Sequence, residues 1–302
     1  CHISILSRIT ERIISVNITR LLSPFEQFLL FLQTEMKEPQ AWGRFHLLTL
    51  GLMCCAIAVL YTRRKQHCET QLKFVLGMYS IISLTTEVLK QLSWTFNYDI
   101  ATQVVLWDYE WYSFPYQLCS TPMYVCLACF LMKKCKLRDT LLSYIAYITV
   151  LGSIATIFMP DSCFVSDILV NIHTTHLHFG SFVVSVYLLM SGEVKLERQA
   201  LLRGIFTFMI MVMSAFTLNE LVYWSGILEG ETFNMFYISR HFISELPVFN
   251  DIQQATPYPV FITAYIMTLS LGGFIVYEIA RGIQHLHNKY EPRHKHKLPI
   301  HM

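Results

Sequence analysis

The chain has 302 residues, of which 54% are hydrophobic and only 15% are charged, and its mean hydropathy is +0.42. Soluble domains carry about 25% charged residues, so this composition excludes a soluble enzyme, a disordered chain and a nucleic-acid-binding protein. The formal net charge of +2 says nothing about partners, because it averages over segments that lie in different solvents. The composition therefore predicts a polytopic membrane protein.

The N-terminal segment, residues 1–42, differs from the rest of the chain. Near its start, apolar residues such as Ile9 and Ile13 recur at helical spacing, and Arg8 and Arg12 stand between them. A short helix of this kind lies in the membrane interface rather than across the bilayer. We therefore expect residues 1–42 to be an amphipathic segment on the membrane surface.

Seven long apolar stretches follow, and each could cross a hydrocarbon core about 30 Å thick at about 1.5 Å per residue. They predict an all-α, polytopic membrane protein, a seven-helix transmembrane bundle that occupies residues 43–284. A basic, histidine-rich tail is expected over residues 285–302. The predicted spans are 44–62, 73–93, 113–132, 140–159, 168–190, 203–226 and 258–281.

The basic residues indicate the orientation of this bundle. Sixteen Lys and Arg residues fall in the loops after spans 1, 3 and 5 and in the tail, whereas the alternate loops hold only Arg240. Cytoplasmic loops carry the excess of positive charge. The N-terminus is therefore expected outside and the C-terminus in the cytoplasm, with a cytoplasmic tail over 285–302.

Polar side chains within the spans are the candidate site residues, because ionisable groups in a membrane are expensive and mark function by default. Counted from the outer ends of the spans, all of them lie about 5–15 Å below the outer surface. This common depth predicts one outward-facing polar pocket. The residues are His46 in span 1, Glu87 and Lys90 in span 2, Gln117 and Cys119 in span 3, His173, His176 and His178 in span 5, and Asn219 and Glu220 in span 6.

Spacing restricts how these groups combine. Glu87 and Lys90 stand three residues apart, so we expect an ion pair that is structural rather than catalytic. At 100° per residue, His178 points about 160° away from His176, so either His178 or its two companions face the bundle centre. A three-histidine zinc site in this span is therefore geometrically poor, and we expect neither a metal nor another cofactor.

Cys119 is the thiol whose neighbours in the chain, Gln117 and Ser120, are polar. A thiol near a histidine at the edge of a bilayer can act as a nucleophile with its base, and a phospholipid ester is the natural substrate at that depth. Attack would give a thioester, which passes its acyl chain to a lysolipid or to water. The alternative interpretation is that Cys119 is a small buried hydrophobe.

Several short motifs carry a resemblance to a known family. They are the segment Phe-Pro-Tyr-Gln-Leu-Cys over 114–119, the Glu87/Lys90 pair, Pro160-Asp161, and the segment from His178 to Tyr187-Leu188-Leu189. Over about residues 43–283 the chain resembles the YwaF-type bacterial integral membrane proteins, which are similar to the transmembrane protein 164 family. That family is regarded as membrane phospholipid acyltransferases that use a cysteine and a histidine.

The resemblance implies that Cys119 is the nucleophile and His178 the base, and that His173 and His176 are extra histidines. It also implies a multi-pass protein of the bacterial plasma membrane whose partners are the bilayer and a phospholipid or lysophospholipid. Two other functions stay open. One is a transporter or small-molecule receptor without catalysis, and the other is a metal-dependent membrane hydrolase that uses His46, His173, His176 and Glu220. The oligomeric state is left open.

Overall fold

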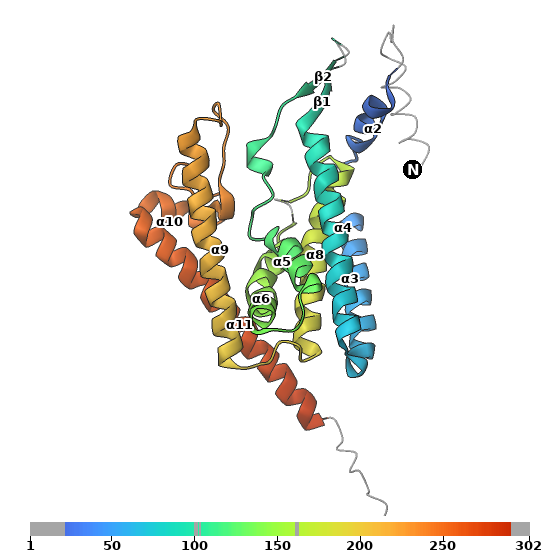
Figure 1. Cartoon of the computed structure of the whole chain (residues 1–302), viewed down its shortest axis with the longest axis vertical. Coiled ribbons are helices and arrows are strands. Elements are labelled where there is room, and N and C mark those ends of the chain that lie inside the picture. Colours follow the sequence, from blue (N-terminus) through green and yellow to red (C-terminus); the bar gives the residue numbers. More distant parts are fainter. Residues whose placement is uncertain (1–21, 100–101, 103, 161–162, 291–302) are drawn as a thin grey trace, which may run out of the picture.

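The computed structural model describes residues 22–99, 102, 104–160 and 163–290, and this part of the chain is mostly helical (Figure 1). The expected surface segment is described only from residue 22, and the expected tail only as far as residue 290, where it continues the last helix. The elements are α2 (Pro24–Leu32), α3 (Arg44–Arg63), η1 (Arg64–Gln66), α4 (Glu69–Thr95), β1 (Phe96–Asp99), β2 (Val104–Trp107), η2 (Trp111–Ser113), α5 (Thr121–Leu131), α6 (Lys136–Tyr144), the π-helical η3 (Ile145–Thr149), α7 (Val150–Phe158), α8 (Ile168–Met190), α9 (Arg198–Ser225), η5 (Met235–Tyr237), α10 (Phe249–Ala255) and α11 (Tyr258–Tyr290).

Five helices in the described residues are long and apolar enough to cross a membrane, and they coincide with predicted spans 1, 2, 4, 6 and 7. The predicted fifth span is helical as α8, which carries three of the candidate histidines. The count of seven spans therefore stays a prediction. The five helices are Arg44–Gln66, Glu69–Thr95, Lys136–Phe158, Arg198–Ser225 and Tyr258–Tyr290.

The third predicted span differs from the expectation of a helix over 113–132. Only α5, with 11 residues, is a continuous α-helix there, and the chain from residue 114 to residue 120 is not helical. Pro122 explains where the helix begins, because a proline fits in the first turn but its ring clashes with the carbonyl four residues earlier. At about 1.5 Å per residue, α5 covers roughly half of a hydrocarbon core.

The loop predicted over 94–112 contains a short antiparallel hairpin, which the all-α expectation missed. Its register pairs Phe96 with Trp107 and Asp99 with Val104. Aromatic and β-branched residues such as these favour strands. The hairpin extends α4 beyond the helical bundle (Figure 1).

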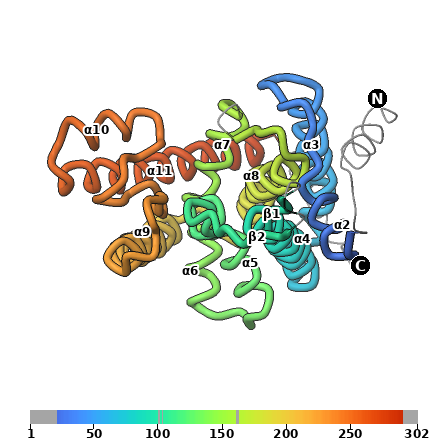
Figure 2. Tube along the Cα trace, turned by 90° about the horizontal axis from the view of Figure 1, so that it is seen from above, coloured from blue at the N-terminus to red at the C-terminus, as the bar shows by residue number. Residues whose placement is uncertain are grey.

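Helix packing surrounds the π-helical segment η3 and α8 with other helices. α4 packs on α5 and α8, α3 covers α8, and α9 and α11 pack against η3 (Figure 2). All five residues of η3 are buried. Gly204 of α9 allows the close approach, because a Cβ there would lie 2.8 Å from the carbonyl oxygen of Ser143. Small residues bring helix backbones together in the same way in membrane bundles.

The outside of the bundle is apolar. Large side chains on the outer helices are more than half exposed, among them Leu48 and Leu52 of α3, Met213 of α9, and Met267 and Leu271 of α11. Soluble monomers rarely expose apolar patches of this extent. A surface of this kind suits contact with lipid chains.

Candidate functional site

Cys119 lies where the non-helical part of the third predicted span meets α5. It directly precedes Ser120, the N-cap residue of the helix, and its side chain is partly buried. No carbonyl of the described residues accepts the Cys119 N–H group. The thiol therefore lies at the N-terminal end of α5, which is the positive end of the helix dipole.

The amide side chains of Gln117 and Asn219 hold the loop after α9 against the bundle. Gln117 donates to the Asn234 carbonyl at 2.9 Å and accepts from the Phe236 N–H at 2.7 Å. Asn219 holds Met235 in the same two-sided manner, at 3.0 and 2.8 Å. Met235 and Phe236 are fully buried, so the loop is packed into the bundle.

Two of the predicted pocket residues, Gln117 and Asn219, thus hold the same loop, residues 234–237. Gln117 stands two residues before Cys119 in the chain.

Glu87 is the centre of a buried polar network. Its carboxylate contacts Lys90 Nζ at 2.8 Å, as the spacing predicted, and His173 Nε2 at 2.9 Å. Gln91 donates to the same carboxylate at 2.8 Å, and Thr86 holds the other nitrogen of His173 at 3.0 Å. Buried charges are stable only when they are paired in this way.

His178 faces a different helix from His173, as the helical angle predicted. Its Nδ1 lies 3.0 Å from the Thr156 hydroxyl of α7, and that hydroxyl lies 4.0 Å from the Cys163 thiol. No hydrogen bond between described residues joins His178 to Cys119.

The third histidine of α8 has yet another environment. His176 stacks on the ring of Tyr79, with ring centroids 5.6 Å apart, and its Nε2 lies 3.3 Å from the Tyr79 carbonyl. Tyr79 also donates to the Leu177 carbonyl at 3.1 Å, which fixes α4 against α8. His176 therefore belongs to the helix interface.

The structure places two predicted pocket residues apart from these contacts. His46 accepts from the Trp42 N–H at 3.0 Å and packs against Phe164. Glu220 lies 3.2 Å from His241 Nε2. Within the described residues, no three metal-ligating side chains gather in one place. The four residues considered for a metal-dependent hydrolase are therefore spread over separate contacts.

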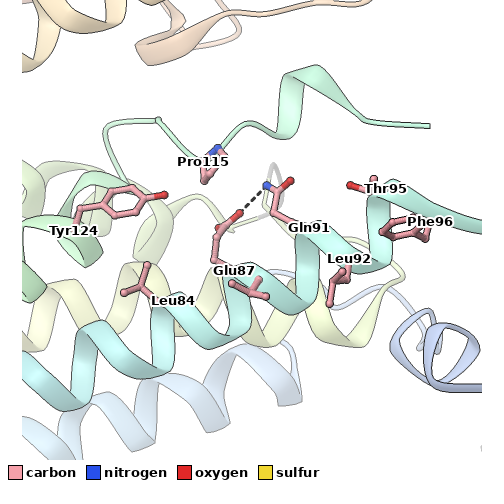
Figure 3. Close-up of a pocket in the computed structure, with 9 residues that line it drawn as sticks. Leu84, Glu87, Gln91, Leu92, Thr95, Phe96, Pro115 and Tyr124 are labelled. Carbon is pink, nitrogen blue, oxygen red and sulfur yellow. Dashed lines mark hydrogen bonds between the residues drawn. The ribbon is translucent and has the colours of Figure 1, made fainter. Parts of the chain in front are cut away.

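A groove runs along α4 beside the Glu87 network (Figure 3). Its volume is about 420 Å³, and its walls are α4, Pro115 of the non-helical segment and Tyr124 of α5. Glu87 and Gln91 reach its edge, joined by the hydrogen bond drawn in the figure. The remaining lining is mostly apolar: Leu84, Val88, Leu92, Thr95 and Phe96.

Some members of the site could not be identified from spacing. Thr156 and Cys163 gave no signal, since a threonine in a span ordinarily bonds to its own helix, as Thr156 also does to the Gly152 carbonyl at 3.1 Å. The partner that completes the Glu87 pair, His173, lies 86 positions further along the chain. Such a pairing between helices cannot be read from periodicity within one of them.

Comparison with known proteins identifies the family. The family model of the TMEM164 family matches residues 41–277, which is most of the chain and covers every residue of the candidate site. No curated protein and no solved structure matches the chain. With its apolar helices and this match, the chain belongs to the TMEM164 family and is a multi-pass membrane protein.

Proposed function

We propose that this chain is a membrane phospholipid acyltransferase in which Cys119 is the nucleophile and His178 the base. The observation that carries the proposal is the break in the third predicted span at Cys119, between residues 114 and 120. Non-helical backbone at membrane depth persists only where it is buried in protein or lines a cavity. Here it places a thiol beside the N-terminus of a helix.

The reaction follows from these groups. The imidazole takes the thiol proton, and the thiolate attacks the ester carbonyl of a phospholipid. The resulting oxyanion forms at the N-terminus of α5, where the helix dipole stabilises it. When the carbonyl re-forms, the ester C–O bond breaks and the lysolipid leaves with the proton from the imidazolium. A second lysolipid, or water, then attacks the thioester by the same steps in reverse and restores the thiol.

The choice of His178 rests on the family resemblance together with its contacts. Both nitrogens of His173 are engaged by Glu87 and Thr86. His178 contacts the Thr156 hydroxyl, which lies 4.0 Å from the Cys163 thiol. The proposal requires the His178 imidazole and the Cys119 thiol to exchange a proton in the lipid-bound protein.

The proposal is tested with the purified protein in nanodiscs that contain a phospholipid with a radiolabelled acyl chain. Wild type is expected to retain label that hydroxylamine releases, and Cys119→Ser to lose that label completely. Cys126→Ser removes a buried thiol of α5, the helix that follows Cys119, and is the matched control, expected to label as wild type does. His178→Gln should slow labelling at least 100-fold.

Two results would contradict the proposal. Hydroxylamine-sensitive label that persists in Cys119→Ser would exclude this thiol as the nucleophile. Bound lipid without any covalent label in wild type would favour a receptor or transporter.

We also infer that the bundle crosses the plasma membrane seven times, with the N-terminus outside. The inference is supported by the five apolar helices, the helical α8 and the distribution of Lys and Arg. It would place the Cys119 site nearer the outer surface, with phospholipid and lysophospholipid as partners.

A further inference from the structure

We propose that the groove along α4 holds one acyl chain of a membrane phospholipid, lying parallel to the helix. The groove is the volume of about 420 Å³ lined by α4, Pro115 and Tyr124. The choice of a phospholipid chain as the occupant rests on the proposed function, whereas the shape and chemistry of the groove are independent of it.

The groove has the length and direction of a lipid chain. Its lining extends along α4 from Leu84 to Phe96 (Figure 3). At about 1.5 Å per residue this is a length of about 18 Å. One leaflet of a hydrocarbon core is about 15 Å thick, which is half of the ~30 Å total. Since α4 is one of the apolar helices that can cross the membrane, the groove runs in the direction in which lipid chains lie.

The lining offers contact without hydrogen bonding. Leu84, Val88 and Leu92 stand four residues apart on α4 and form a single apolar stripe. The two polar residues at the edge already have partners inside the protein. Gln91 donates to Glu87 and to the Ser113 carbonyl, and the Glu87 carboxylate contacts Lys90 and His173. A hydrocarbon chain in the groove therefore leaves the bonds of Glu87 and Gln91 in place.

The groove opens sideways, between the helices. Val88 is 58% exposed and Tyr124 is 38% exposed, although both line the groove. On a helix that crosses a membrane, such an opening faces hydrocarbon. A lipid chain can enter it directly from the bilayer.

Two residues of the groove flank the candidate nucleophile in the chain. Pro115 stands four residues before Cys119, and Tyr124 stands five residues after it. A chain held between them and α4 would bring the glycerol-ester end of its lipid toward the segment that carries the thiol.

The test uses full-length protein in nanodiscs that contain a phosphatidylcholine with a diazirine in one acyl chain. After irradiation, peptide adducts are counted by mass spectrometry. Peptides from the groove, which contain Val88 and Tyr124, should carry at least five times more adduct than the outer face of α3, which contains Leu48 and Leu52. Annular lipid alone would label these surfaces equally, and that result would overturn the proposal.

Val88→Trp fills the groove and should lower the adducts at Tyr124 at least fivefold, while labelling of α3 shows that the variant is folded. Ile82→Trp is the matched control, because Ile82 is an exposed apolar residue of α4 that does not line the groove. Undiminished adducts at Tyr124 in Val88→Trp would also overturn the proposal. Cys119→Ser should keep full groove labelling, so loss of the acyltransferase function and loss of the groove are distinguished.

Discussion

At the scale of single residues, the Glu87 carboxylate is a charged group that is costly to bury. Its side chain is buried, and it contacts Lys90, His173 and Gln91 together. Removing one partner of a buried ion pair is strongly destabilising, because the other charge stays buried without compensation. The network is therefore asymmetric. Glu87 contacts two basic side chains, Lys90 and His173, whereas Lys90 is paired with Glu87.

This asymmetry can be measured by thermal unfolding in detergent. Glu87→Gln is expected to cost about 3–5 kcal/mol, since it leaves Lys90 without a counter-charge and removes the carboxylate that His173 contacts. Lys90→Met should cost only about 1–3 kcal/mol, because Glu87 keeps two partners. Equal losses in the two variants would contradict the asymmetry.

A matched control exists on α11. Glu278 and Arg281 form a pair with the same spacing, but both side chains are largely exposed. Glu278→Gln is expected to change the free energy of unfolding by less than about 1 kcal/mol.

At the scale of helices, the break before α5 and the π-helical η3 are the two departures from regular spans. Thr121, at the end of the break, bonds through its hydroxyl to Tyr144, the residue directly before η3, at 2.7 Å. π-helical turns are rare and often lie at functional sites. The two irregular segments thus meet beside Cys119.

Close packing around η3 depends on glycine. A Cβ at Gly204 would lie 2.8 Å from the Ser143 carbonyl oxygen, and the backbone cannot yield as a flexible side chain does. Gly204→Ala is therefore expected to lower the free energy of unfolding by about 1–3 kcal/mol, measured by thermal unfolding in detergent. At Gly51 of α3 an added Cβ meets nothing within 4 Å, so Gly51→Ala should be neutral or slightly stabilising. If both variants unfold alike, close contact at Gly204 is not what holds α9 in place.

The sequence predicts the helices far better than their interruptions. Hydropathy locates the long spans, since burial in lipid imposes long apolar runs. The helical angle also separated His173 from His178 correctly, and spacing paired Glu87 with Lys90. α5 begins near Pro122 because the proline ring clashes with the carbonyl four residues earlier, and the hairpin forms because β1 pairs with β2 across a loop. Both features depend on contacts between particular residues, which an average of hydropathy over a window does not contain.

At the scale of the whole molecule, one buried arginine connects three of the predicted cytoplasmic segments. Arg138 is fully buried and binds both Glu69, at the start of α4, and Glu193, after α8. Glu193 also contacts His67, 3.1 Å away, in the connection before α4. One end of the bundle is therefore tied together by charge. Arg138 counts toward the positive charge of its loop, yet it acts inside the protein.

The predicted orientation can be tested with cysteines that the chain already contains. Cys68 and Cys135 are exposed and lie in loops predicted to be cytoplasmic. A membrane-impermeant maleimide should leave both unmodified in intact cells and modify both after permeabilisation, as read by peptide mass spectrometry. Trp107→Cys on the hairpin should react in intact cells, since Trp107 is exposed on the opposite side. Modification of Cys68 and Cys135 in intact cells, without modification at Trp107→Cys, would show that the topology is the opposite of the predicted one.

The sideways opening of the α4 groove, through Val88 and Tyr124, has a consequence for how any reaction there is measured. A molecule that enters from the bilayer is supplied by two-dimensional diffusion, so its occupancy follows its mole fraction among the lipids rather than its amount per volume of buffer. Mixing the substrate lipid with inert lipids should therefore lower the reaction rate per protein molecule. Diluting the vesicles in buffer should leave that rate unchanged.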